Sequence, residues 1–274
     1  MTTAPVKKLV LRLAAPSMAI MLISSLYNMA DTFFVSWLGT SATAAVGVAF
    51  PLMAIIQAVG FFFGQGSGNY VSRQLGAMNF DAASKMLTTG FISTLFIGSL
   101  ITCSGIAFIE DIAVIVGATP TILPYAKEYL FYILLAVPWM TSSLMLNQQL
   151  RFQGSAFYGM IGMTSGAVLN VVLDPIFIYT LRMGAGGAAA ATMISQFVGF
   201  CLLLAGCFRQ GNIRPRLRDF SPSFALYMEI IRGGVPSLLR QSLASIASIC
   251  VNRLAGIHGD AAIAAMSIVT RITM

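Results

Sequence analysis

The chain has 274 residues, of which 57% are hydrophobic and only 9% are charged, with a formal net charge of +7. A soluble domain usually carries about 25% charged residues, so this composition excludes a water-soluble globular protein and indicates an integral membrane protein. The basic excess does not indicate a nucleic-acid partner, because no solvated domain is present to display it. The four cysteines lie within or at the ends of apolar runs without a CxxC or Cys/His pattern, so we expect neither disulfides nor a zinc site.

Apolar segments of about 20 residues, long enough to cross ~30 Å of hydrocarbon, recur along the whole chain. We place them at residues 15–38, 45–71, 86–109, 122–146, 155–179, 184–208 and 233–255, with an eighth that begins near Ala261. No secretory cleavage pattern follows the N-terminal apolar core, so the first span should be kept as an anchor. The predicted fold is therefore an all-α, polytopic membrane helix bundle.

Basic residues are unevenly shared between the two sets of loops. With a cytoplasmic N-terminus, the inside loops hold eleven Lys and Arg residues and the outside loops only Lys127 and Arg182. This bias predicts a multi-pass protein of the cytoplasmic membrane whose N-terminus faces the cytoplasm. In the long inside loop at 209–232, Ser221 followed by Pro222 predicts the start of a short interfacial helix.

An internal repeat is visible at a spacing of 220 residues. It places Pro16 on Pro236 and Gly39 on Gly259. Because both copies start on spans that run outward, they should be parallel repeats, as in several secondary-transporter folds. We therefore expect a six-helix N-terminal lobe at 1–208, an inter-lobe loop at 209–232 and the start of a second lobe at 233–274. Since the chain stops on an apolar stretch, we expect a truncated product or a partial sequence.

Only two acidic residues, Asp31 and Asp174, lie inside spans. A carboxylate near the bilayer centre costs roughly 2.5–3.5 kcal/mol, so each is a candidate functional residue. Counting 1.5 Å per residue from the outer loops places both, together with Thr192, ~12 Å below the outer helix ends. Asn170 precedes Asp174 by one turn on the same helix face. These oxygen atoms suit a sodium ion and also suit a proton relay.

Two carboxylates in one low-dielectric site cannot both stay ionised cheaply, so a proton or a cation should bind between them. In the alternative interpretation, Asp31 and Asp174 only hydrogen-bond neighbouring helices and lock the bundle. Pro175 and Pro16 are candidate bend points that would free backbone carbonyls. Arg240, four residues after Pro236, should be buried unless it snorkels to the cytoplasmic side.

Two other chemical functions can be rejected from the sequence. The glycine-rich stretch GQGSGN has Asn69 where the dinucleotide fingerprint needs its third glycine, and it follows no strand. We therefore expect no nucleotide and no other cofactor. The single histidine, His258, has no nucleophile at a recognisable spacing, so we do not expect an enzyme.

Three groups of motifs carry a family resemblance. The segments LAAPSMAIMLISSLYNMADTFFVSWLGTSATAAVGVAFP, GQGSGNYVSRQLGAMNFDAA, and LNVVLDPIFIY followed by GGAAAATMISQ resemble, in the same order, the multidrug and toxic compound extrusion (MATE) family. The resemblance covers the whole chain. It implies two lobes of six helices around a central cavity that opens alternately to each side, with amphipathic, mostly cationic drugs leaving as Na⁺ or H⁺ enters.

The resemblance also implies roles for individual residues. It assigns the cation-coupling site to Asp31, Asn170, Asp174 and Thr192, which makes them possible Na⁺ ligands. It assigns the adjacent substrate cavity to Tyr27, Tyr129 and Asn147, and a bend to Pro16. The two first-lobe aspartates resemble the DinF-like branch, whereas the NorM-like branch carries an acid eight residues after the shared proline, where this chain has Ala244.

Two alternatives to a cation-coupled drug antiporter stay open at this point. A flippase for lipid-linked oligosaccharides, from the same superfamily, would want several basic residues in its cavity, and the first six spans supply none in their middles. The chain could also be an inactive half-transporter that needs the missing C-terminal lobe or a second chain. The expected partners are organic small molecules, the lipid bilayer and the coupling ion, and not nucleic acid.

Overall fold

A computed structural model describes residues 6–209, 211–257 and 259–273 of the chain, and these residues form helices and connections without a strand. The helices, in chain order, are α1 (Val6–Ser36), α2 (Thr40–Gly76), α3 (Phe80–Ala107), α4 (Ile109–Ile115), α5 (Leu123–Phe152), α6 (Ala156–Pro175), the π-helical turn η1 (Ile176–Thr180), α7 (Gly184–Cys207), the 3₁₀ turn η2 (Leu217–Asp219), α8 (Phe224–Gly256) and α9 (Asp260–Thr273).

Seven of the described helices are long and apolar enough to cross a membrane, and each coincides with one of the seven predicted spans. The predicted all-α membrane bundle is confirmed. Helix α4 was not predicted, because a seven-residue helix between two spans leaves no distinct hydropathy or periodicity signal.

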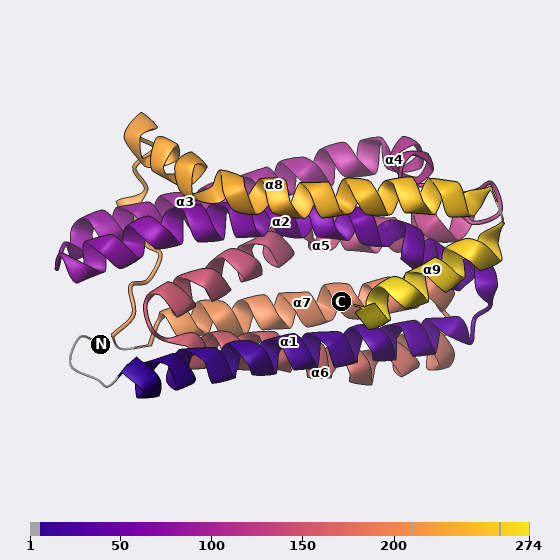
Figure 1. The fold of residues 1–274 in the computed structure, drawn as a ribbon, viewed down its shortest axis with the longest axis horizontal. Helices are drawn as coiled ribbons and strands as arrows, with labels where there is room; N and C mark the ends of the chain where they lie inside the picture. Colours follow the sequence, from indigo (N-terminus) through magenta and orange to yellow (C-terminus); the bar gives the residue numbers. More distant parts are fainter. Residues whose placement is uncertain (1–5, 210, 258, 274) are drawn as a thin grey trace.

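The long helices lie side by side, so that their connections gather at two ends of the bundle (Figure 1). Helices α1, α3, α6 and α8 run from left to right in this view, and α2, α5 and α7 return. At the left end, α2 joins α3, α5 joins α6 and α7 joins α8. We call this end the basic end and the opposite end the far end. The described basic residues at the basic end include Arg73, Lys85, Arg151, Arg209, Arg214, Arg216, Arg218 and Arg232.

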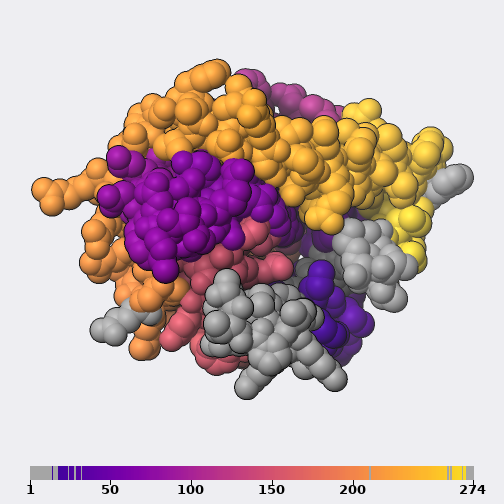
Figure 2. Space-filling model, turned by 60° about the vertical axis from the view of Figure 1, so that its left-hand side comes forward, coloured from indigo at the N-terminus to yellow at the C-terminus, as the bar shows by residue number. Residues whose placement is uncertain are grey.

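The segment between α7 and α8 lies along α3. The Arg216 backbone N–H donates to Thr88 Oγ1 at 3.2 Å, and Ser84 Oγ donates to Asp219 Oδ2 at 2.5 Å. Figure 2 turns the basic end forward and shows this orange segment beside the purple surface of the α2–α3 connection. These hydrogen bonds attach the segment to the side of the bundle where α3 lies.

The structure corrects the prediction of a separate interfacial helix starting at Ser221. Helix α8 begins at Phe224, with Ser223 as its N-cap residue, and continues through Pro236 to Gly256. The amphipathic signal and the apolar span are therefore parts of one helix. A membrane helix can tolerate an internal proline, because neighbouring groups can satisfy the carbonyl that the proline leaves free.

Glycines bring α8 into backbone contact with α2. A Cβ added at Gly66 would overlap the backbone of Ile230, and one added at Gly233 would lie 2.9 Å from the Gly66 Cα atom. At the far end of the same pair, Asn252 Nδ2 donates to the Gly47 carbonyl at 3.5 Å. These contacts fix the antiparallel register of the two helices along most of their length.

Candidate functional site

Asn170 links α6 to α7 in a buried polar cluster. Its Nδ2 donates to Asp174 Oδ1 at 3.1 Å and to Thr192 Oγ1 at 3.2 Å. The three residues are almost completely buried, with Asp174 at 0% exposure. The structure thus brings together three of the four residues expected at the cation site, at the common depth that helical rise predicts.

Asp31 reaches the same depth from α1. It is 5% exposed, on a helix that packs against α6. The register of the two helices is given by Tyr179, whose hydroxyl donates to the Phe34 carbonyl at 2.8 Å. Phe34 lies three residues after Asp31, and Tyr179 lies five after Asp174, so the two acids differ in depth by only about 3 Å.

The cluster has buried oxygen atoms that could take part in ion binding. Among the described residues, Asn170 Oδ1 and Ser195 Oγ are buried without a hydrogen-bond partner. Amide, hydroxyl and carboxylate oxygens are the ligands that a hard cation prefers. Ser195 was missed by the sequence reasoning, although it lies three residues after Thr192 and so on the same helix face.

Helix α6 changes geometry directly after Pro175. The next five residues, Ile176–Thr180, form a π-helical turn, in which the Leu181 N–H donates to the Ile176 carbonyl at 2.9 Å. Proline has no N–H to give to the carbonyl four residues earlier, at Val171. The structure thus shows a change of helix type beside Pro175, and the bend expected there stays a prediction. Pro16 lies within α1, but its side chain is outside the described part of the chain, so its role stays a prediction.

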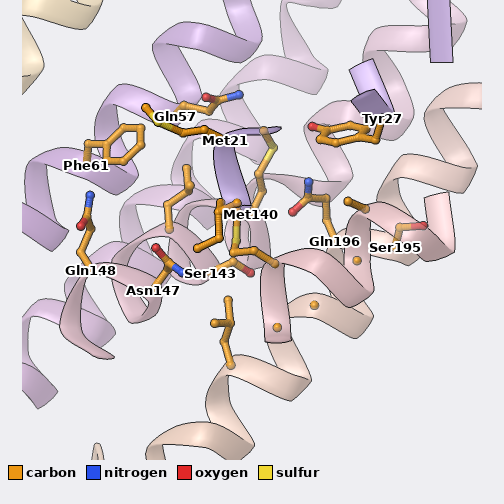
Figure 3. A pocket seen from close by; sticks show the side chains of 18 of the residues that line it. Met21, Tyr27, Gln57, Phe61, Met140, Ser143, Asn147, Gln148, Ser195 and Gln196 are labelled. Atoms are coloured by element: carbon orange, nitrogen blue, oxygen red, sulfur yellow. The ribbon is translucent and has the colours of Figure 1, made fainter. Parts of the chain in front are cut away.

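A cavity of about 540 Å³ opens beside this cluster. Figure 3 shows side chains from several helices converging on it, with Tyr27, Gln57, Asn147 and Gln196 among those labelled. Asn170 and Thr192 also belong to its wall. Its neutral polar lining residues are Ser25, Tyr27, Gln57, Gln65, Ser143, Asn147, Gln148, Asn170, Thr192, Ser195 and Gln196.

Two of the three residues expected in the substrate cavity, Tyr27 and Asn147, do line it. Tyr129 does not, which corrects that expectation. It is 1% exposed within the apolar core, and its hydroxyl lies 4.0 Å from Met53 Sδ. The family resemblance placed this residue in the cavity, but a matching position in the sequence does not determine which side of the helix faces the cavity.

Arg240 is another cavity-lining residue. The sequence left open whether it is buried or snorkels to the cytoplasmic side, and the structure places it on the wall of the cavity instead. Together with Arg151 it supplies the charged part of the lining, and among the described residues no carboxylate lines this space. Asp31 and Asp174 lie outside the lining and are buried between helices.

Comparisons with known proteins agree on one family. A family model described as MatE matches residues 16–176. The multidrug export protein MepA of Staphylococcus haemolyticus is 29% identical over 267 residues, which cover 97% of this chain and 59% of that protein.

Solved structures give the same result. A multidrug resistance MATE family transporter in an inward-facing conformation is 34% identical with a TM-score of 0.87, over 97% of this chain and 61% of that one. A MOP superfamily transporter from Pyrococcus furiosus is 36% identical with a TM-score of 0.87, over 98% of this chain and 60% of that one. The chain thus spans about three fifths of the length of these relatives.

Proposed function

The chain belongs to the MATE family of multidrug efflux transporters, and we propose that it exports amphipathic organic compounds, cations among them, across the cytoplasmic membrane in exchange for entering Na⁺ or H⁺. The transport cycle in this proposal is alternating access. The relatives do not favour the two alternatives raised by the sequence, a flippase for lipid-linked oligosaccharides and an inactive half-transporter.

One observation carries the proposal: Asn170 and Thr192 belong both to the buried cluster around Asp174 and to the wall of the cavity. A ligand in the cavity that hydrogen-bonds these two side chains disturbs the hydrogen bonds around Asp174. An ion that binds their oxygen atoms makes those atoms unavailable to the ligand. Ion occupancy and ligand occupancy therefore oppose each other, which is the differential interaction that coupling requires.

Helix α1 is the element that we expect to respond to the ion. It carries Asp31 on the side of the buried cluster and Tyr27 one turn earlier on the cavity wall. Binding of Na⁺ or H⁺ removes the repulsion between the Asp31 and Asp174 carboxylates, so α1 can pack more closely against α6. This movement carries Tyr27 along and changes the cavity. Bending at Pro16 would add to it.

The test is to neutralise each acid and measure export. In energised everted vesicles, Asp31→Asn and Asp174→Asn should each reduce ethidium transport at least tenfold, because neither amide can exchange a proton or neutralise a sodium ion. The amount of protein in the membrane should be unchanged. Asp81→Asn, an exposed acid in the first turn of α3, is the matched control and should transport normally.

Imposing a Na⁺ gradient or a pH gradient alone identifies the coupling ion. If both variants transport ethidium as fast as the unsubstituted chain under either gradient, Asp31 and Asp174 have no ion-coupling role.

A further inference from the structure

The charged residues of the cavity wall are two arginines. Arg151 lies in the last turn of α5, and Arg240 lies within α8. Arg151 Nη1 donates to Gln148 Oε1 at a long 3.4 Å. For Arg240 the structure shows no hydrogen bond or salt bridge to any described residue, and the two salt bridges found in that part of the chain, Arg73–Glu229 and Lys127–Glu110, are elsewhere.

The register of α2 and α8 gives the depth of Arg240. It lies seven residues after Gly233, which contacts Gly66, and this places it level with Val59. The second contact gives the same level: Asn252 bonds Gly47, Arg240 lies twelve residues before Asn252, and Val59 lies twelve residues after Gly47 on the antiparallel helix. Arg240 is therefore near the middle of the 37-residue helix α2.

The same argument relates Arg240 to the polar cluster at the other end of the cavity. A Cβ added at Gly60 would touch Leu144 at 2.9 Å, so Arg240 is level with Leu144 on α5. Asn147 lies against Gly159 of the antiparallel α6, so the level of Leu144 corresponds to Gly162. Asn170 is eight residues further along α6, which amounts to a separation of about 12 Å along the bundle.

A lone guanidinium within a membrane span costs roughly 2.5–3.5 kcal/mol, so arginines at such depths normally have a partner. Guanidinium groups bind carboxylates and phosphates by paired, charge-assisted hydrogen bonds. Between Arg240 and the polar cluster, the wall includes the apolar side chains of Met21 and Met140. The cavity volume of about 540 Å³ matches that of sites for drug-sized ligands.

We infer that Arg240, with Arg151 nearer the basic end, binds the acid group of an amphipathic ligand, which is a carboxylate, a sulfonate or a phosphate ester. This inference rests on the proposed export function and names a substrate class for it. The best substrates are zwitterions of drug size, whose acid meets Arg240, whose apolar body lies along the wall, and whose cationic group points toward the end of the cavity near Asp31 and Asp174. Arg240 is then a specificity-determining residue.

A pair of dyes that differ by one ester tests the inference directly. Rhodamine 110 has a free carboxylate, and rhodamine 123 is its methyl ester with the same cationic ring system. Binding of each is measured by fluorescence polarisation to the whole chain in phosphatidylcholine nanodiscs. Arg240→Gln should weaken binding of rhodamine 110 about tenfold, as expected for the loss of one charge-assisted contact, and should leave rhodamine 123 within about twofold.

Two further variants distinguish the loss of the Arg240 charge from a general disturbance of the protein. Arg240→Lys should keep part of the rhodamine 110 affinity, because the charge remains without the paired geometry. Arg232→Gln removes an exposed arginine of α8 that does not line the cavity, and it should change neither affinity. Equal losses for acid and ester in Arg240→Gln, or no loss for the acid, would overturn the inference.

The acid could belong to a soluble compound or to a lipid headgroup. Phosphatidylglycerol in the nanodiscs should displace rhodamine 110 if the headgroup is the natural occupant, and should leave its binding unchanged if a soluble acid is. Ethidium, a cation without an acid group, reports on the export function separately in vesicles of the unsubstituted protein. Failure of ethidium export would refute the proposed function. If Arg240→Gln leaves the ratio of the affinities for rhodamine 110 and rhodamine 123 unchanged, only the acid-binding role is refuted.

Discussion

A single amide, that of Asn170, donates to both Asp174 and Thr192, and it also faces the cavity. Sequence reasoning could place these residues at one depth, because each depth follows from helical rise and loop position alone. The family resemblance placed Tyr129 in the cavity, and the structure places it in the core, since the direction of a side chain depends on which neighbour its helix packs against. Ser195 shows the reverse case, a residue overlooked although its spacing from Thr192 was visible.

Removing the Asn170 amide should weaken binding of the coupling ion at this site. In Asn170→Ala the site loses the amide oxygen Oδ1, which is buried without a hydrogen-bond partner among the described residues and is of the kind that a hard cation prefers. If Na⁺ is the coupling ion, we expect Na⁺-dependent protection against thermal unfolding to need about tenfold more Na⁺. Thermal unfolding across a Na⁺ titration measures this. Asn69→Ala, at an exposed position of α2, is the control, and identical titrations for the two variants would contradict the role of Asn170.

At the level of elements, α8 departs most from its prediction. The amphipathic segment and the apolar span form one helix from Phe224 to Gly256, which glycine contacts hold against α2. Local signals such as Ser221–Pro222 indicate a helix start, but neighbouring groups decide whether the chain uses it. The missing N–H of Pro175 is visible in the sequence, because it is a property of proline itself, but the π-helical turn that follows it was not predicted.

The close contact between α2 and α8 requires a residue without a side chain at Gly66. In Gly66→Ala the new methyl group overlaps the Ile230 backbone and should push α8 away, at a cost of about 1–3 kcal/mol. We expect a lower thermal midpoint in detergent and faster proteolysis of the segment between α7 and α8. Gly76→Ala, at the end of the same helix, adds a methyl group with no described atom within 4 Å and should melt like the unsubstituted chain. A normal melt for Gly66→Ala would show that the two helices do not pack this closely.

For the molecule as a whole, the basic residues gather at one end of the bundle, where α2–α3, α5–α6 and α7–α8 connect. The far end mixes both signs among its described charges, with Glu110, Asp111 and Glu128 near Lys127 and Arg182. Basic residues near span ends favour the cytoplasmic side, so the basic end should face the cytoplasm. The parallel repeat stays a prediction, which the common direction of α1 and α8 in Figure 1 supports.

Labelling of single cysteines tests this orientation. In a background without the four native cysteines, Arg218→Cys at the basic end should react with a membrane-impermeant maleimide only in everted vesicles. Asp111→Cys at the far end should react only in intact cells. At least a fivefold difference between the two preparations is expected at each site. The opposite pattern would invert the topology and place the ion-site layer near the cytoplasm.

The sequence by itself determined the membrane class, the seven spans and the common level of Asp31, Asp174 and Thr192, because hydropathy and helical rise are local quantities. Only the tertiary structure decided which of these residues meet: Asn170 with Asp174 and Thr192, Tyr129 with the core, and Arg240 with the cavity. Those outcomes depend on the register and rotation of one helix against another. These are set by contacts such as Gly66 on Ile230 and Tyr179 on Phe34, between residues more than 140 positions apart in the chain.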